Sequence, residues 1–176
     1  MEYLDVLDEK GNKTGLIKSK DEVHVLGLWH RTVHVWLVNF KNEILFQLRS
    51  KDKISYPNTW DVSVAGHISA GEESLESAVR ESEEELGIVI EKDDLKFIST
   101  VINCSILNGG TFIDNQFNDI YLLKTDLKIE DFRFSDGEVE KVEYISLDTF
   151  KKWVKDGKTD LQPRSEEYEL LSNYLK

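Results

Sequence analysis

The segment from Gly66 to Ile88 constrains the fold more than any other part of this chain. It reads GHISAGEESLESAVRESEEELGI, a glycine-containing loop followed by a run with helical periodicity. At roughly 100° per residue, one apolar stripe of the helical wheel collects Leu75, Ala78, Val79, Ser82 and Leu86. The spacing predicts an amphipathic helix over Ser74–Leu86, buried on that stripe and ended by Gly87 at its C′ position.

Three glutamates, Glu81, Glu84 and Glu85, lie beside the apolar stripe of this helix. Their i, i+3, i+4 spacing brings the carboxylates together, and like charges so close destabilise a helix unless something neutralises them. One interpretation is a solvated acidic face, which is common on exposed helices. The other is a site for a hard divalent cation such as Mg²⁺ or Mn²⁺, which prefers oxygen ligands.

The residues around the glutamates decide between these interpretations. The segment fits the pattern G-x5-E-x7-R-E-U-x-E-E-x-G-U, where U is apolar, and its seven fixed positions are Gly66, Glu72, Arg80, Glu81, Glu84, Glu85 and Gly87. Seven such identities coincide by chance roughly once in 10⁷ to 10⁸ windows. The chain therefore resembles the Nudix hydrolase family. Ser82 is the one departure, and it bears on packing rather than on metal binding.

The resemblance implies a metal-dependent active site on this helix. Glu81, Glu84 and Glu85 would hold Mg²⁺, with Mn²⁺ as an alternative and the Gly66 carbonyl as a further candidate ligand. The metal would bridge a diphosphate, neutralise its charge and activate an attacking water. Arg80 precedes Glu84 by four residues and is placed to pair with it. Glu84, Glu85 and Arg80 are accordingly the catalytic candidates within the motif.

Other segments are similar to the isopentenyl diphosphate isomerase-like branch of the family, and to the Nudix domain of a plant two-domain protein. They are HRTVH from His30, QLRS from Gln47 and YPNTWD from Tyr56. Isomerases of this branch carry a catalytic cysteine where this chain has Ala65, and an alanine cannot move a proton at an allylic carbon. The intact acids also favour hydrolysis. The one cysteine, Cys104, is expected to be a small buried side chain.

The same resemblance aligns His30 and His67 with positions that hold an additional metal in the isomerases. Without the cysteine partner, a hydrogen-bonded histidine at a strand end or in a loop is the alternative. His67 is also a candidate substrate contact.

Substrate contacts and a general base are sought outside the helix. Arg49 and Lys53 belong to a small basic cluster, and a guanidinium fork suits phosphate oxygens, although simple solvation is the alternative. Trp60, just ahead of the motif, is a candidate for lining the substrate pocket. Hydrolysis needs a base for the water. Glu85 is one candidate, and Glu138 on an acidic loop is the other, unless that loop is only a solvated turn.

Strands and helices alternate along the rest of the chain. Strands are predicted at Tyr3–Leu7, His30–Asn39, Glu43–Arg49, Trp60–Ala65, Ile88–Ile90, Leu95–Cys104, Asn115–Lys124 and Val142–Ile145, and further helices at Leu147–Asp156 and Ser165–Leu175. This order predicts an α/β fold with a mixed sheet between helices. The resemblance makes it a Nudix α/β/α sandwich. No repeat or linker interrupts the 176 residues, so we expect a single Nudix domain over 1–176 with the motif at 66–88.

Charge limits the partners. With 34 acidic and 22 basic residues the net charge is −12, which repels nucleic acids and anionic membranes. No apolar run approaches the roughly 20 residues of a membrane span, and the acidic amino terminus lacks the features of a signal peptide. We therefore expect a cytoplasmic protein whose partner is a small-molecule diphosphate, with a metal to offset the charge.

These observations predict Mg²⁺-dependent hydrolysis of a diphosphate bond in an X-diphosphate, where X is a nucleoside or an isoprenoid alcohol. One alternative is an isopentenyl diphosphate isomerase that uses another acid in place of the cysteine. Another is a non-catalytic diphosphate-sensing domain, whose hallmark would be broken metal acids. The sequence does not determine the oligomeric state.

Overall fold

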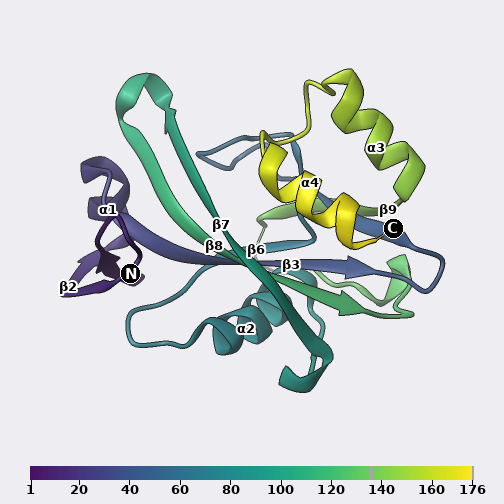
Figure 1. Cartoon of the computed structure of the whole chain (residues 1–176), viewed down its shortest axis with the longest axis horizontal. Helices are drawn as coiled ribbons and strands as arrows, with labels where there is room; N and C mark the ends of the chain where they lie inside the picture. Colours follow the sequence, from purple (N-terminus) through teal and green to yellow (C-terminus); the bar gives the residue numbers. More distant parts are fainter. Residues whose placement is uncertain (135–136, 176) are drawn as a thin grey trace.

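In the computed structural model, which describes residues 1–134 and 137–175, the chain folds into a mixed β-sheet with helices on both faces (Figure 1). The strands are β1 (Tyr3–Leu7), β2 (Lys13–Ser19), β3 (Trp29–Val38), β4 (Glu43–Arg49), β5 (Trp60–Asp61), β6 (Val64–His67), β7 (Leu95–Leu107), β8 (Phe112–Lys124) and β9 (Val139–Ser146). The helices are α1 (Lys20–Leu26), α2 (Ser74–Leu86), α3 (Leu147–Asp156) and α4 (Ser165–Tyr174). The predicted α/β architecture is confirmed.

Strand β3 is the centre of the sheet. Strand β8 runs parallel to it along its whole length, and β6 pairs antiparallel with residues Thr32–Val35. Strands β1 and β4 join its two ends, and β7 and β9 extend the sheet by pairing with β8 and β4. The elements on which function depends, β6 and α2, are therefore anchored to the most buried strand.

The alternation of side chains along β3 divides its residues between the two faces. Val33, Val35 and Leu37 join the core under α2, whereas Trp36 and Val38 join the core under α3 and α4. His30, Thr32 and His34 share the second face by the same alternation. Helices α3 and α4 thus cover only one half of this face, and the polar half of β3 is left as the floor of a cavity.

Helix α2 has the predicted bounds and ends at Gly87, whose φ of 66° is the left-handed conformation that glycine adopts readily. Ala78, Ser82 and Leu86 are fully buried, with Leu75 and Val79 packed at the edge of the core. The Ser82 hydroxyl donates to the carbonyl of Ala78 at 2.7 Å, so this buried polar side chain is satisfied within the helix.

Three expectations about elements need correction. Residues 88–90 alternate in burial like a strand, with Val89 exposed, but they form no ladder, so the predicted strand there is wrong. Strand β2 was not predicted from the sequence; it pairs with β1 and most of it is exposed. Predicted strand Trp60–Ala65 is two short strands, β5 and β6.

Cys104 also differs from expectation, because it is exposed rather than buried. It lies on β7, which among the described residues pairs only with β8 and so has one open edge. None of the helices formed by residues 1–134 and 137–175 has the length and apolar character needed to cross a membrane.

Candidate active site

Gly66, on β6, lies directly against the side chain of Glu81 on helix α2. A Cβ built on this residue would lie 1.9 Å from the carboxyl carbon of Glu81. A larger residue would therefore displace the Glu81 carboxylate. The position of the Glu81 carboxylate therefore requires a glycine at residue 66.

Arg80 holds the acids of the motif together. Its Nη1 donates to Glu81 at 2.7 Å and to Glu84 at 3.0 Å, and its Nη2 donates to Glu72 and to the His67 carbonyl, each at 3.0 Å. Its Nε donates to Glu72 at 3.1 Å. Burial alone would lower the pKa of Arg80, but the surrounding carboxylates outweigh it and raise that pKa. With all three nitrogens engaged, Arg80 serves to position the carboxylates.

Two of the three glutamates are buried in an environment that disfavours their negative charge. Burial raises the pKa of Glu81 to about 7, with Arg80 opposing the shift and Glu84 adding to it. Burial, together with the charge of Glu81, also raises the pKa of Glu85. The Ala65 amide and the Gln47 side chain both donate to one oxygen of Glu85 at 3.1 Å. Adjacent buried carboxylates of this kind have the chemistry of a divalent-cation site, because a cation would offset their repulsion.

A cavity of about 1000 Å³ opens beside these acids, on the uncovered part of the sheet face. Glu81 and Glu84 line one side, and Thr32, His34 and Ala65 lie on the floor. Glu85 lines none of it. The cavity is large enough for a small organic diphosphate.

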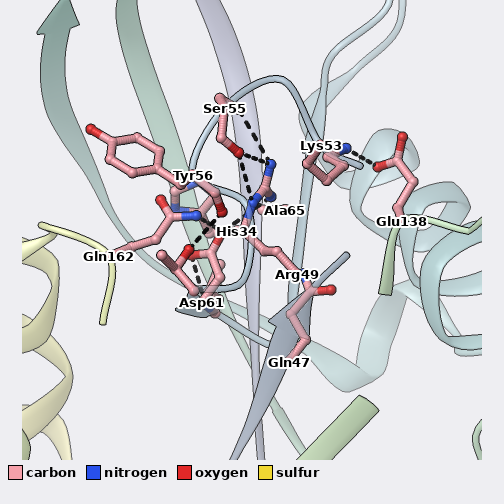
Figure 2. A network of polar contacts seen from close by, with 12 residues as sticks. His34, Gln47, Arg49, Lys53, Ser55, Tyr56, Asp61, Ala65, Glu138 and Gln162 are labelled. Carbon is pink, nitrogen blue, oxygen red and sulfur yellow. Dashed lines mark hydrogen bonds and ion pairs between the residues drawn. The ribbon is translucent and has the colours of Figure 1, made fainter. Parts of the chain in front are cut away.

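Two predicted residues meet at the wall opposite α2. The Lys53 ammonium lies 2.5 Å from the Glu138 carboxylate (Figure 2). The Ser50 amide donates to the Glu138 carbonyl at 2.8 Å. Burial would raise the pKa of Glu138, but the ion pair with Lys53 outweighs it and lowers that pKa. Both side chains line the cavity, so the loops that carry them form one continuous rim.

Arg49 is buried in the same wall. Its Nη1 lies 3.4 Å from the Asp61 carboxylate, and its Nη2 donates to the Ser55 carbonyl at 3.0 Å (Figure 2). Asp61 is fully buried, and it also accepts from Gln162 at 2.6 Å and from Arg164 at 2.7 Å. Burial would raise the pKa of Asp61, but Arg164 and Arg49 outweigh it and lower that pKa.

Three histidines gather at the opposite end of the cavity. Ligand atoms of His24, His30 and His67 all lie within 4.8 Å of one another. The Asp114 carboxylate lies 3.4 Å from Nε2 of both His24 and His30. These four side chains each have a buried polar atom without a hydrogen-bond partner among the described residues. Burial lowers the pKa of His67 well below its usual value, which keeps its ring neutral and able to ligate a metal.

The cavity brings together most, but not all, of the residues predicted from the sequence. Arg49, Lys53, His67 and Glu138 line it together with acids of the motif. Trp60 does not line it. The Trp60 ring packs 6.1 Å from that of Trp153 in the core on the other side of β5.

Several residues of the cavity had no signal in the sequence. Asp114 and Arg164 come from segments without a motif, and Glu167, which does not line the cavity itself, reaches His34 there from helix α4. Their residue types are ordinary, and only the fold brings them to the cavity. His24, on α1, could have been grouped with His30 and His67 only by knowing how α1 packs.

Comparison with known proteins supports the motif. The NUDIX domain matches residues 28–164, which is well over half of the chain and includes the whole of β3 through α3. This chain belongs to the Nudix hydrolase family. The predicted family and enzyme class, a Nudix pyrophosphohydrolase, are confirmed, and such enzymes generally use divalent cations and act on small molecules.

Similar proteins include members of both expected groups. Nudix hydrolase 3 of Arabidopsis thaliana is 44% identical over 156 residues, which are 87% of this chain but only 20% of that protein. An uncharacterized Nudix hydrolase of Clostridium acetobutylicum is 37% identical, covering 90% of this chain and 76% of the relative. An isopentenyl-diphosphate Delta-isomerase of Pectobacterium atrosepticum is 29% identical, covering 81% of this chain and 75% of the relative.

A crystal structure of a Deinococcus radiodurans protein shares the fold. Its TM-score is 0.75 at 23% identity, and the match covers 96% of this chain and 98% of that chain. The predicted Nudix fold is therefore confirmed.

Proposed function

We propose that this chain hydrolyses a diphosphate bond in a small X-diphosphate, with Mg²⁺ or Mn²⁺ held by Glu81, Glu84 and Glu85. The observation that carries the proposal is the acid cluster itself, in which Glu81 and Glu85 are buried and Arg80 holds Glu81 and Glu84 at the edge of a cavity. The Gly66 carbonyl remains a proposed ligand. X is a nucleoside or an isoprenoid alcohol.

The chain's own residues would position the substrate and move the proton. When bound, the metal supplies charge neutralisation for the diphosphate and a lowered pKa for a bound water. Lys53 and Arg49 would contact phosphate oxygens from the wall opposite α2. Glu138 is the better placed base, because it lines the cavity and Glu85 does not. Lys53 would turn from Glu138 toward the substrate phosphates, and Glu138 would accept the proton of the attacking water.

A panel of substrates tests this proposal directly. Phosphate and pyrophosphate release would be measured with Mg²⁺ or Mn²⁺ from nucleoside di- and triphosphates, nucleotide sugars, dinucleotide polyphosphates and isoprenoid diphosphates. Glu84→Gln should lower turnover by at least about a hundredfold with the fold retained, because it removes an exposed metal ligand. Glu83→Gln is the matched control, since Glu83 is an exposed neighbour on the same helix. Equal rates in the two variants would contradict the site assignment.

The isomerase is the second candidate function, and the histidine cluster is the observation that favours it. We propose that His24, His30, His67 and Asp114 form a second metal centre, since their orphaned buried atoms have the donor chemistry that Zn²⁺ or Mn²⁺ requires. The floor between the two centres carries Ala65 and no thiol, because Cys104 is exposed on β7. Deuterium exchange into isoprenoid diphosphates without phosphate release would support isomerisation and overturn hydrolysis.

Metal analysis tests the histidine centre independently of activity. The purified chain should retain about one additional equivalent of a transition metal after mild chelation. His67→Ala should lose that equivalent, whereas His34→Asn should keep it because His34 lies outside the cluster and contacts Glu167 and Arg164 instead. Absence of bound metal after reconstitution would leave these residues as a hydrogen-bonded histidine group.

A further inference from the structure

The wall of the cavity at β5 and α4 has its cations in front and its anions behind. Arg49, His34 and Arg164 line the cavity, whereas Asp61 and Glu167 are fully buried behind them and line none of it. Burying so many charges is costly unless each is paired, so the arrangement must be specified by side-chain contacts. The positive and donor groups are the ones presented to a ligand.

Asp61 is the residue that sets the two guanidinium groups side by side. Its Oδ1 accepts from Arg164 Nε at 2.7 Å and from the Val62 amide at 2.8 Å. Its Oδ2 accepts from Arg164 Nη2 at 3.3 Å, from Arg49 Nη1 at 3.4 Å and from Gln162 at 2.6 Å. One carboxylate therefore holds two guanidinium groups side by side at the cavity, and Glu167, 3.9 Å from Arg164, balances the second positive charge from behind.

His34 completes the support behind Arg164. Its Nδ1 lies 2.9 Å from the Glu167 carboxylate, and its Nε2 lies 3.2 Å from Arg164 Nη1. Because a guanidinium only donates, Nε2 must be the acceptor and Nδ1 must carry the proton. Trp36 donates to the other Glu167 oxygen at 2.7 Å. Arg164 is thus held on two sides, by Asp61 and by His34.

Arg164 still has donors to offer. Three of its five N–H groups are directed to Asp61 and His34, and Nη1 lies 3.9 Å from Glu167, beyond hydrogen-bond distance. Among the described residues, one N–H on Nη1 and one on Nη2 have no acceptor. Arg80, in contrast, has every nitrogen bound to the motif. Arg164 therefore has more donor capacity left for a ligand than the arginine of the motif.

We infer that Arg164 is a substrate contact that binds phosphate oxygens of the diphosphate together with Arg49, and that Asp61 is its positioning residue. This inference rests on the proposed function, since it assigns one wall of the same cavity to the substrate. A bidentate guanidinium pair matches the spacing of phosphate oxygens, and both arginine side chains are only 10% exposed, which strengthens the interaction by limiting solvent screening. The segment just before α4 thereby supplies a phosphate-binding residue that the motif lacks.

Binding of methylenediphosphonate with Mg²⁺, measured by calorimetry, tests the inference without requiring turnover. Arg164→Met should weaken binding by about ten- to a hundredfold, as expected for loss of hydrogen bonds to a charged group. Arg164→Lys should recover only part of this loss, because it keeps the charge but not the fork. With a hydrolysed substrate, both variants should raise KM while kcat changes by less than about threefold.

Two control variants separate contact from structure. Arg31→Met removes an arginine that pairs with Asp119 at 3.6 Å and lines none of the cavity, and its binding should equal that of the unaltered chain. Glu167→Gln disturbs the network from behind and should lower Tm while changing Kd by less than about threefold. If Arg164→Met does not fold, Arg164→Lys at an unchanged Tm decides the question.

The outcomes distinguish the two proposals. Binding by both Arg164 variants within twofold of the unaltered chain would overturn the contact, as would equal losses in Arg164→Lys and Glu167→Gln. Arg164-dependent binding without hydrolysis of any compound in the panel would retain the subsite and overturn the proposed function.

Discussion

The two walls of the cavity are built in different ways. The acidic wall comes from one helix, where Glu81 and Glu84 line the cavity and Glu85 is their neighbour because the helix repeats every 3.6 residues. The cationic wall, which is lined by Arg49, His34 and Arg164, is assembled from segments far apart in the sequence. Asp61 and its partner Arg164, for example, are more than a hundred residues apart. A site that depends on local periodicity can be found in a sequence, whereas a site that depends on packing cannot.

The cationic wall also contributes more to the stability of the fold than the acidic wall does. Its charges are buried more deeply than Glu84, and each depends on a partner from another element. Glu84 can lose its charge without disturbing the core. The comparison therefore predicts that substitutions in the acidic wall change activity, and that substitutions in the cationic wall change stability as well.

The largest expected effect is from removing Asp61. Asp61→Ala would leave the buried Arg49 and Arg164 guanidinium groups without their shared carboxylate. Loss of one partner of a buried ion pair typically costs about 3–5 kcal/mol. Urea unfolding should show this decrease in the free energy of unfolding. A decrease below about 1 kcal/mol would mean that the wall is not held together through Asp61.

Next in size is a change in the acidic wall that spares the fold. Gly66→Ala would place a methyl group where the Glu81 carboxylate lies, and that carboxylate can move because it ends a flexible side chain. Displacement by about 1 Å can cost a hundredfold in rate, so turnover should fall by about that factor with Tm within a few degrees. Gly71→Ala is the matched control.

At Gly71 nothing lies within 4 Å of an added Cβ, but its φ of 81° disfavours any side chain. This variant should lose about 1 kcal/mol of stability while the rate per folded molecule stays the same. A loss of turnover in Gly71→Ala together with a loss of stability but not of turnover in Gly66→Ala would contradict the steric account of Gly66.

A smaller effect is expected from pH. The pKa of Glu81 is raised to about 7 from 4.5, so the metal-free native state binds a proton that the unfolded chain has lost. Its contribution to stability is therefore present below pH 4.5 and is lost as pH rises through 7. A bound cation displaces that proton, so the increase in Tm caused by Mg²⁺ should grow between pH 5.5 and 7.5. Glu81→Gln should flatten this dependence, and a constant increase in the unaltered chain would contradict it.

The smallest effect is expected at Cys104, outside both walls. Cys104→Ser should change the free energy of unfolding by less than about 0.5 kcal/mol, because its side chain is exposed on β7. Thermal unfolding of the two proteins measures this. A loss above about 1 kcal/mol would mean that the thiol has a packing role.

The elements that were predicted correctly are those specified by local sequence, as in the acidic wall, and the errors lie where packing between distant segments decides. Helix α2 and its end at Gly87 were predicted correctly, and the strands β7 and β8 were predicted three residues short at their facing ends, because periodicity and composition specify these elements locally. Residues 88–90 had the composition of a strand but no strand beside them to pair with. Whether a short apolar run joins a sheet depends on its neighbours, which a single segment does not encode.

The candidate site was predictable to the same extent. Arg49, Lys53 and Glu138 were chosen for charge and position, and the fold brings all three to the cavity. Trp60 was chosen for its place before the motif, yet its side chain is directed into the core beside Trp153. No sequence pattern indicated a role for Arg164, since an arginine before a helix is common and its pairing with Asp61 appears only in the fold.

Strand β3 has a consequence for how this chain can vary in length. It supplies the core under α2, the core under α3 and α4, and the cavity floor, all by strict alternation over Trp29–Val38. Inserting or deleting one residue there would exchange the two faces, so that His34 would enter the apolar core and Val33 the cavity. The hairpin tip at Asn108–Gly110 is exposed and carries no such register. Related chains should therefore differ in length at the tip and keep the residue count of β3.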